Sequence, residues 1–569
     1  MERAITLHSQ VCKTDWSIRA DELASCNGLL PAQLRKETSA MGVRFRADVD
    51  RMLRQASTVE RRAEIERLRG AILDLAFISN ATALIHVKLP NELLQEIFSH
   101  IYPGAPRDIR ATHVCRVWRT FIIGLSKFWA DFLGAPEMYI IRKGDAEAVS
   151  MFETFLSRSA PNMHGLSLRG RNLAVVDASN LTRLSSLYLL FKPKDLPAVH
   201  HFLGHRMPNL HTLAMRFHCH TEEPPRRALR GPARAYGGNF PRLRNLSSSG
   251  IFLPEYLSAP SITHLELTEC FESCDIHLPG ELRMLSIDAL VKFVASCVSL
   301  ESFQLTNCTP DDAFDADFST PRLHLPHLRT FAVEDEDWDW GSKFLHCFTF
   351  PPTTHLKAVC SSGGLQDIIP VSKFEELLSS IDSVVVRLIP DQFKRPCCTV
   401  HGCSRGAERL SVTARDFAFD AEAGELMLHD LIRLFPAPTN ILSLYVEFHD
   451  ELLAAEHAWK DALSALSSLQ CLALRGGSLY DLLRALSQED VLLPQLEHLI
   501  LASRRWHSDE LLVLAVESRA ARGYTLEKLT LLGLGPGGEA ARGVGPIFGP
   551  SENSVNRLKT LVPDVSALF

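Results

Sequence analysis

The densest group of reactive side chains is the segment Cys397-Cys398-Thr-Val-His401-Gly-Cys403, with Cys360 upstream. Structural zinc usually takes ligands from two separated Cys-x2-4-Cys pairs. Here two cysteines are adjacent, so both could reach one tetrahedral ion only if the chain bent between them, and no second pair follows. We therefore predict no metal and no cofactor, and we interpret the segment as a surface loop with incidental thiols. An enzyme that uses this cluster stays open as an alternative.

Two other features that could carry chemistry lack the necessary context. Gly533-Leu-Gly-Pro-Gly-Gly538 follows a candidate strand, but it contains Pro536 and no Gly-Lys-Ser/Thr follows. We therefore predict a turn here and not a phosphate-binding loop. None of the 23 histidines accompanies a nucleophile in a turn such as Gly-x-Ser-x-Gly. The sequence therefore predicts no catalytic residues and a protein that is not an enzyme.

Two charged segments are candidates for recognising another protein. An arginine cluster can hold an acidic or phosphorylated segment, and an acidic run around Trp338 and Trp340 can hold a basic peptide. Because runs of charge are usually solvated, exposed loops are the alternative for both. The first segment contains Arg226, Arg227, Arg230 and Arg234, and the second contains Glu334, Asp335, Glu336, Asp337 and Asp339.

Composition and charge narrow the class of protein. The chain has 569 residues, a length that favours two or more domains or one long repeat array. Hydrophobic residues make up 46% and charged residues 22% of the chain, as is typical of soluble folded proteins. A net charge of -7 gives no long-range attraction to a polyanion, so we expect no nucleic-acid partner. No apolar run of about 18 residues occurs, and residues 1–20 carry charges, so we expect no membrane span and no secretion signal. The 14 cysteines then indicate reduced thiols and a cytoplasmic or nuclear protein.

A helical seam is predicted between Arg44 and Leu75. This stretch has no proline, and Ile65, Leu68, Ile72 and Leu75 recur at steps of three and four residues. The seam is clean over only about one and a half heptads. A short coiled coil and a solvated helix packed on its own domain both remain open.

Three short apolar helices follow within residues 84–135. Pro90 is expected at the first helical position, where its missing N–H would have no partner anyway. Pro103 and Pro106 break this helix, and Asp108 can cap a second one. So small a unit is marginal unless it docks on another surface. Its apolar residues are Leu93, Leu94, Ile97, Phe98 and Ile101, then Val114, Cys115, Trp118 and Ile122, then Phe128, Trp129, Phe132 and Leu133.

This combination of residues resembles an F-box. The similarity implies a three-helix module that binds the S-phase-kinase-associated adaptor of cullin-RING ubiquitin ligases. The family often has two leucines where this chain has Ile109-Arg110. The charged helix ahead of the module is also similar to that of F-box proteins abundant in mushroom-forming fungi. The adaptor contacts that the resemblance implies are Leu89, Pro90, Leu93, Leu94, Ile97, Phe98, Val114, Cys115, Trp118 and Trp129.

The remaining sequence repeats the pattern apolar-x-x-apolar-x-apolar at intervals of about 18–30 residues, the range of leucine-rich repeats. Cys270 and Cys308 follow two copies where such repeats carry Asn or Cys, and 289–297 and 452–466 are amphipathic. The alternative is a set of buried strands in another α/β fold. The strong copies are Leu210/Leu213/Met215, Ile262/Leu265/Leu267, Leu282/Leu285/Ile287, Leu300/Phe303/Leu305, Leu328/Phe331/Val333, Ile441/Leu444/Val446, Leu469/Leu472/Leu474, Leu496/Leu499/Leu501 and Leu526/Leu529/Leu531; weaker ones begin at Leu243, Leu356 and Ile381.

The expected fold is therefore α/β, with short N-terminal helices (1–83), a three-helix F-box (84–135) and an irregular leucine-rich-repeat solenoid (160–569). By this resemblance we expect a substrate-recognition subunit of an SCF-type ubiquitin ligase, with the adaptor and cullin complex and an unknown target protein as partners. An F-box scaffold or sensor without ubiquitin transfer is the alternative. Candidate target-reading positions between the core residues are His211, Thr212, His264, Glu266, Ser302 and Gln304.

Overall fold

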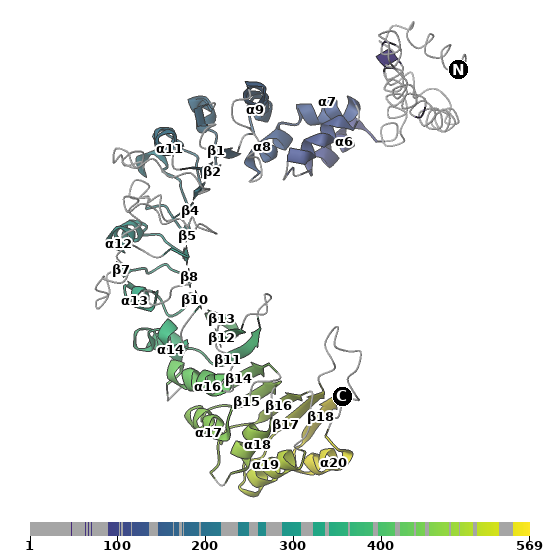
Figure 1. Cartoon of the computed structure of the whole chain (residues 1–569), viewed down its shortest axis with the longest axis vertical. Helices are drawn as coiled ribbons and strands as arrows, with labels where there is room; N and C mark the ends of the chain where they lie inside the picture. The colour runs from purple at the N-terminus through teal and green to yellow at the C-terminus, as the bar shows by residue number, and fades with distance from the viewer. Residues whose placement is uncertain are drawn as a thin grey trace. The chain divides into compact units, whose positions relative to one another are not determined.

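The computed structural model divides into two compact units, one ending at Leu190 and one beginning at Phe191 (Figure 1). The seam residues between 44 and 75, the arginines of 226–234 and Trp338 and Trp340 lie outside the described residues. The structure describes positions 47, 63, 66–67 and 70 and residues 89–568, except 102, 104–105, 115, 136–145, 163, 170–172, 175, 193–194, 218–236, 250–259, 269–286, 309–322, 336–340, 362–364, 391–395, 416–421, 437–439, 450–453, 477–478, 489, 504–508 and 534–549.

The first unit begins with a small helical module. Pro90 lies just before its first helix, one position earlier than predicted, and its carbonyl accepts a hydrogen bond from the Leu94 N–H (3.1 Å). Asp108 does not cap a continuous second helix, because the chain makes a 3-10 helix before α7 begins. The elements are α6 (Asn91–Ser99), η1 (Pro106–His113), α7 (Arg116–Gly124) and α8 (Ser126–Gly134).

Aromatic side chains form the core of this module. The rings of Phe98 and Trp118 lie edge to face with centroids 4.9 Å apart, which packs α6 against α7. Trp129 of α8 is 1% exposed, and its indole N–H donates to the Ile122 carbonyl (2.9 Å). This bond pairs a carbonyl at the end of α7 that has no partner within the helix. The three helices therefore share one core.

The same core continues into the rest of the first unit. The rings of Trp129 and Phe155 of α9 (Ala146–Ser159) stack with centroids 4.9 Å apart. Gly134 and Gly165 touch so closely that a Cβ on Gly165 would lie 3.1 Å from the Gly134 Cα. Glycine is therefore needed where α8 meets the sheet. The remaining elements are β1 (Gly165–Arg169), α10 (Ala178–Leu181) and β2 (Ser186–Phe191), and β1 pairs with β2 in parallel.

The second unit contains one large, mostly parallel sheet, so the predicted α/β class is confirmed. Its strand order is β3-β4-β5-β6-β8-β10-β13-β12-β11-β14-β15-β16-β17-β18, and only β12 runs antiparallel to its neighbours. The strands are β3 (Thr212–Phe217), β4 (Asn245–Ser249), β5 (His264–Thr268), β6 (Ser302–Thr306), β8 (Thr330–Asp335), β10 (His355–Cys360), β11 (Ser383–Pro390), β12 (Pro396–Ser404), β13 (Ala407–Arg415), β14 (Ser443–Phe448), β15 (Cys471–Arg475), β16 (His498–Ser503), β17 (Lys528–Gly533) and β18 (Asp564–Leu568), with a separate pair β7 (Leu323–His324) and β9 (Phe348–Thr349).

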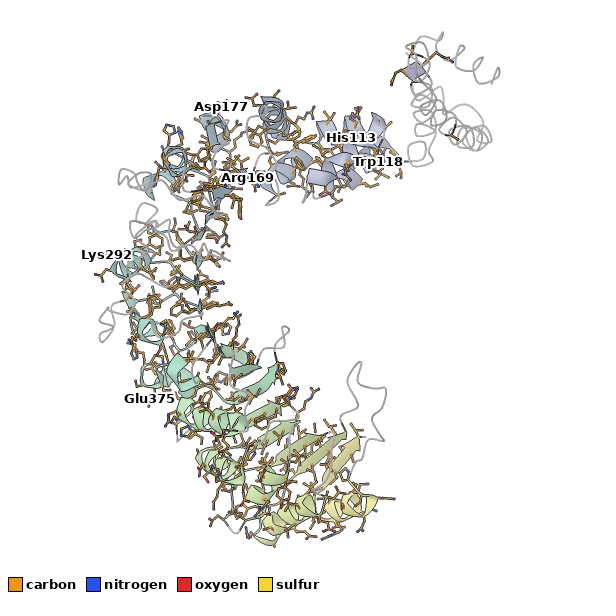
Figure 2. The ribbon with its side chains drawn as sticks, viewed as in Figure 1. His113, Trp118, Arg169, Asp177, Lys292 and Glu375 are labelled. Carbon is orange, nitrogen blue, oxygen red and sulfur yellow. The ribbon has the colours of Figure 1, made fainter. Side chains whose placement is uncertain are left out.

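Helices follow most of the strands along the chain and cover one face of the sheet (Figure 1). Lys292 of α12 and Glu375 of α15, labelled in Figure 2, lie on this helical side. The predicted helices at 289–297 and 452–466 are present as α12 and α17. The helices are α11 (Leu196–Leu203), α12 (Ile287–Ser296), α13 (Gly341–Leu345), α14 (Leu365–Ile368), α15 (Glu375–Ser379), α16 (Ala423–Leu434), α17 (Glu456–Ala465), α18 (Tyr480–Ser487), α19 (Asp509–Ala521) and α20 (Glu552–Leu561).

The repeated apolar motif determines how the strands align. Leu265 of β5 lies beside Leu246 of β4 on one side and Phe303 of β6 on the other, and all three are at most 1% exposed. In-register parallel pairing places equivalent motif positions side by side, so the leucines form continuous buried rows. The strand predictions are confirmed for the described copies except one. Ile287 begins helix α12, and the other two residues of that copy lie outside the described residues.

The predicted surface loop at 397–403 is wrong, because these residues form β12, a central strand of the sheet. Cys398 points into the core and is completely buried, as side chains on one strand alternate between faces. The hairpin to β13 turns at Arg405 and Gly406, both with positive φ (52° and 79°), as a two-residue turn of this kind requires. Asp382 supports the turn by accepting a hydrogen bond from the Arg405 N–H (2.8 Å).

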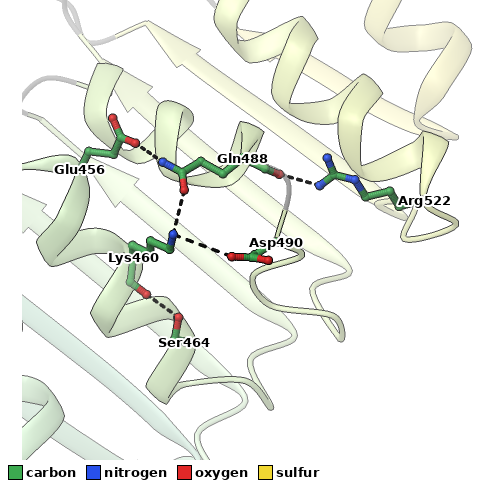
Figure 3. A network of polar contacts seen from close by, with 6 residues as sticks. All are labelled: Glu456, Lys460, Ser464, Gln488, Asp490 and Arg522. Carbon is green, nitrogen blue, oxygen red and sulfur yellow. Dashed lines mark hydrogen bonds and ion pairs between the residues drawn. The ribbon is translucent and has the colours of Figure 1, made fainter.

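Polar side chains tie neighbouring helices together on the helical side (Figure 3). Gln488, just after α18, donates to Glu456 of α17 and accepts from Lys460 Nζ (3.0 Å). Its backbone carbonyl accepts from Arg522, just after α19 (2.5 Å). One residue therefore links three consecutive repeats. In the part of the chain that is described, no helix has both the length and the apolar character needed to cross a membrane.

Candidate protein-interaction surfaces

Helix α6 carries two large apolar side chains that the first unit leaves exposed. Leu93 is 51% and Ile97 is 48% exposed, and the two are four residues apart on one helix. Residues at this spacing lie on the same helical face. Val114, just after η1, is 50% exposed as well. Exposed large apolar groups on so small a module are typical of a surface that binds another protein.

The other residues implied as adaptor contacts lie elsewhere in the module. Leu94 and Phe98 are each 2% exposed, and Trp129 is also buried, so these three build the core under the surface. Trp118, labelled in Figure 2, is half-buried against Phe98. Of the remaining residues, Leu89 is half-buried, Pro90 is exposed and Cys115 lies outside the described residues.

Polar contacts hold α6 in place without covering its apolar face. Lys127 of α8 donates to the Ser99 carbonyl at the end of α6 (3.1 Å). His100, one residue further, lies 3.0 Å from Glu96. A cation near the last carbonyls of a helix is favourable because those carbonyls carry partial negative charge. The contacts of Lys127 and His100 therefore hold the helix that carries Leu93 and Ile97, and they leave these two side chains uncovered.

The second unit presents the sheet face opposite the helices as its other candidate surface. Side chains at the positions between the buried apolar residues project from this face, which we call the open face. In-register pairing arranges these side chains in rows across the strands. Five of the predicted target-reading residues lie in two such rows: Thr212, His264 and Ser302 in one, and Glu266 and Gln304 in the next; His211 directly precedes β3.

Ion pairs run across the open face, and each of the two described next spans the strand that lies between its partners. Arg216 of β3 lies 3.0 Å from Glu266 of β5 and also donates to the Thr268 hydroxyl. Further along the sheet, Arg415 of β13 lies 2.7 Å from Glu334 of β8. Glu334 belongs to the acidic segment found in the sequence, and here it is paired with an arginine inside the sheet. Cross-strand pairs of this kind contribute modestly to stability and set the charge pattern of the face.

A second cluster surrounds Glu408 near the β12–β13 turn. His401 Nδ1 lies 2.7 Å from one Glu408 oxygen, and His355 Nε2 lies 3.8 Å from the other. Burial lowers the pKa of His355, and the Glu408 charge opposes this shift only in part. His355 therefore favours its neutral form more than an exposed histidine does. His401 was predicted as part of a loop but lies in strand β12 instead.

The chemistry of the thiol-rich segment follows from its strand conformation. Cys397 and Cys398 point to opposite faces of β12, so the two sulfurs cannot converge on one ion. Burial raises the pKa of Cys398 strongly, which suppresses the thiolate that acts as nucleophile or ligand. Within the described residues, Glu497, His498 and Glu527 do bring ligand atoms within 4.8 Å of one another. Both glutamates of this group are exposed, and exposed acidic groups are common on proteins without a metal ion.

The residues that sequence reasoning missed are a charged trio on the open face. Arg387, Glu447 and Arg475 lie side by side on β11, β14 and β15. Each of the three comes directly after the last apolar residue of a repeat motif. This shared position is the only signal in the sequence that could have predicted the trio. No known protein family and no curated protein matches this sequence. Geometry and the residues themselves therefore carry the functional argument.

Proposed function

We propose that this chain is the substrate-recognition subunit of an SCF-type cullin-RING ubiquitin ligase. In this proposal the module α6–α8 is an F-box that binds the S-phase-kinase-associated adaptor. The second unit is an irregular leucine-rich-repeat solenoid whose open face binds the target. The chain performs no covalent chemistry in this proposal. It raises the effective concentration of target lysines near a ubiquitin-charged enzyme brought by other subunits.

The observation that carries the proposal is the exposed apolar pair on α6. A core already exists beneath it, so the exposure of Leu93 and Ile97 is not a failure of packing within the unit. Burying such a pair on a partner gives affinity through the hydrophobic effect. The pattern of parallel strand and helix in the second unit supports the other half of the proposal, since stacked repeats present one long face of side chains.

Co-purification with the adaptor tests this proposal. The natural chain is compared with a Leu93→Ser/Ile97→Ser double variant and with Leu514→Ser, a control in α19 that removes a side chain of similar exposure (53%). We expect the natural chain and the control to retain the adaptor and the double variant to lose it with an unchanged circular-dichroism spectrum. Failure of the natural chain to bind the adaptor contradicts the proposal.

Reconstitution separates the ligase from a scaffold. The full chain is mixed with adaptor, cullin, RING subunit and the ubiquitin-activating and ubiquitin-conjugating enzymes. We expect the chain's own lysines to receive ubiquitin when the adaptor is present and not when the double variant replaces the natural chain. Adaptor binding without any ubiquitin transfer favours the scaffold or sensor alternative.

A further inference from the structure

Three charged residues share one place on the open face of the second unit. Arg387 of β11 and Arg475 of β15 flank Glu447 of β14, and the pairing register puts all three in one row. Arg387 Nε lies 3.3 Å from one oxygen of Glu447, and Arg475 Nε lies 3.4 Å from the other. A single carboxylate thus orients two guanidinium groups from both sides.

The charge of this trio is unbalanced. The side chain of Glu447 is only 16% exposed, whereas Arg387 is 48% and Arg475 is 51% exposed. Within the bounds of β11, β14, β15 and β16, Glu447 is the only carboxylate, and His498 is the only other residue that can carry positive charge. The row therefore bears a net positive charge with its cations facing solvent. Each guanidinium has five N–H donors, so donors remain for an additional acceptor.

An apolar row lies beside the charged row. The strands β11, β14 and β15 and their neighbour β16 each carry an apolar residue two positions before the charged row. These residues are Val385, Tyr445, Ala473 and Ile500. A strand rises about 3.3 Å per residue, so the two rows are roughly 6.6 Å apart. This spacing equals the distance between side chains i and i+2 on one side of an extended peptide. Figure 1 places the helices of this region on the opposite face of the sheet.

We propose that these two rows form a subsite for an extended segment of the target protein that carries an apolar residue and an acidic residue two positions apart. The apolar side chain lies on the Tyr445–Ile500 row, and the acidic group accepts hydrogen bonds from Arg387 and Arg475. The anion is a carboxylate or a phosphate monoester, which share this recognition chemistry. The inference rests on the proposed function, because it names the class of target for the same open face.

Complementarity argues for an acidic occupant over a basic or neutral one. A lysine placed on this row meets two arginines for one carboxylate, so like-charge repulsion opposes it. A neutral polar residue gives the guanidinium donors that Glu447 does not engage no ionic acceptor. Charge-assisted, two-donor contacts to one anion are also shorter and stronger than neutral hydrogen bonds.

Selection from a phage-displayed library of random peptides on the full-length chain tests the subsite. The strongest peptide is then synthesised, labelled and titrated by fluorescence polarisation, together with versions in which the acidic residue is replaced by Gln, Lys or phosphoserine. We expect enrichment of peptides with an apolar and an acidic residue two positions apart, in either order. We also expect the Gln version to bind at least about tenfold more weakly, and binding to weaken as NaCl rises. The ranking of the acidic and phosphoserine versions identifies the anion.

Variants locate the binding on the trio. Arg475→Ala and Arg387→Ala should each weaken binding of the acidic peptide about tenfold. The control is Arg557→Ala, a residue of α20 with equal exposure (50%) that also pairs with a glutamate, Glu517 (2.6 Å). Equal binding of the acidic and Gln peptides, or equal effects of Arg475→Ala and Arg557→Ala, overturns the inference.

Adaptor capture by the same preparations keeps the two proposals apart. The peptide titration needs no adaptor, so it succeeds or fails independently of the ligase proposal. Retention of the adaptor by Arg475→Ala together with loss of the peptide supports the subsite. A natural chain that binds the adaptor but selects no acidic peptide overturns the subsite and leaves the ligase proposal intact.

Discussion

Replacing Arg519 should destabilise the C-terminal repeats, although this residue lies on helix α19 and not on the open face. This arginine of α19 is only 4% exposed. Its two terminal nitrogens donate to the carbonyls of Leu492 (2.6 Å) and Leu493 (3.0 Å). Leu493 adopts the left-handed conformation (φ 56°), so the chain before β16 turns sharply. The Leu493 carbonyl also accepts a hydrogen bond from the Leu496 N–H (3.1 Å), so it would keep one partner without Arg519.

The expected magnitude follows from these two bonds. The Leu492 carbonyl would lose the bond from Arg519, which costs about 1–3 kcal/mol for a buried carbonyl left without a partner. The bond to Leu493, whose carbonyl keeps the Leu496 N–H, adds about 0.5–1.5 kcal/mol. Burial lowers the pKa of Arg519, which means that burying its charge is itself unfavourable, and removing the charge recovers part of this cost. We therefore expect Arg519→Met to lower the free energy of unfolding by about 1–3 kcal/mol.

Hydrogen exchange measured by mass spectrometry is the assay, because long repeat arrays need not unfold in a single step. Peptides covering 488–503 should exchange faster in Arg519→Met, and urea should unfold this region earlier. Arg522→Met is the matched control, since Arg522 is exposed and makes one hydrogen bond to Gln488. Equal protection in the two variants, or a gain in stability from Arg519→Met, would refute the reasoning.

Three other expectations follow from single sites. Burial raises the pKa of Asp131, whose buried Oδ2 has no hydrogen-bond partner among the described residues. Because the folded state then favours the protonated carboxyl, Asp131→Asn should stabilise the first unit at pH 7. This gain in stability should vanish as the pH falls below the ordinary carboxyl pKa, and thermal unfolding at pH 7 and pH 3.5 checks both expectations. Burial raises the pKa of Cys297 to about 12, so iodoacetamide at pH 8 should label this thiol only after unfolding, and labelling of native protein would contradict it. Gly402→Ala should cost about 1–3 kcal/mol, because the new Cβ would lie 2.6 Å from Ile381 Cδ1; an unchanged urea midpoint would count against that packing.

Much of the second unit could be predicted because its motif is periodic. In the copy around Leu265 and Leu267, the apolar residues alternate with His264, Glu266 and Thr268, and the strand β5 forms there. Alternation determines which side chains are buried whenever one face of a strand is covered. The helix predicted at 289–297 is present as α12 (Ile287–Ser296) for the same reason, with a period near 3.6 in place of 2.

The hairpin β12–β13 was missed although its signal is present. Cys398, Val400 and Gly402 alternate with more polar residues, and Arg405-Gly406 provides the turn. The cysteines drew attention as possible metal ligands, whereas a buried thiol behaves as a small apolar side chain. Reading Cys398 as a core residue would have predicted the strand.

The sequence by itself determined the repeating apolar pattern, and with it the α/β class and the location of most strands, because these depend on spacing along the chain. Only the tertiary structure decided which apolar residues of α6 are buried and which remain exposed: Phe98 packs on Trp118, while Leu93 and Ile97 meet no core. The charged trio on the open face likewise depends on the register of β11, β14 and β15, which are separated along the chain. Contacts between distant segments are set by pairing and packing, and a local pattern does not encode them.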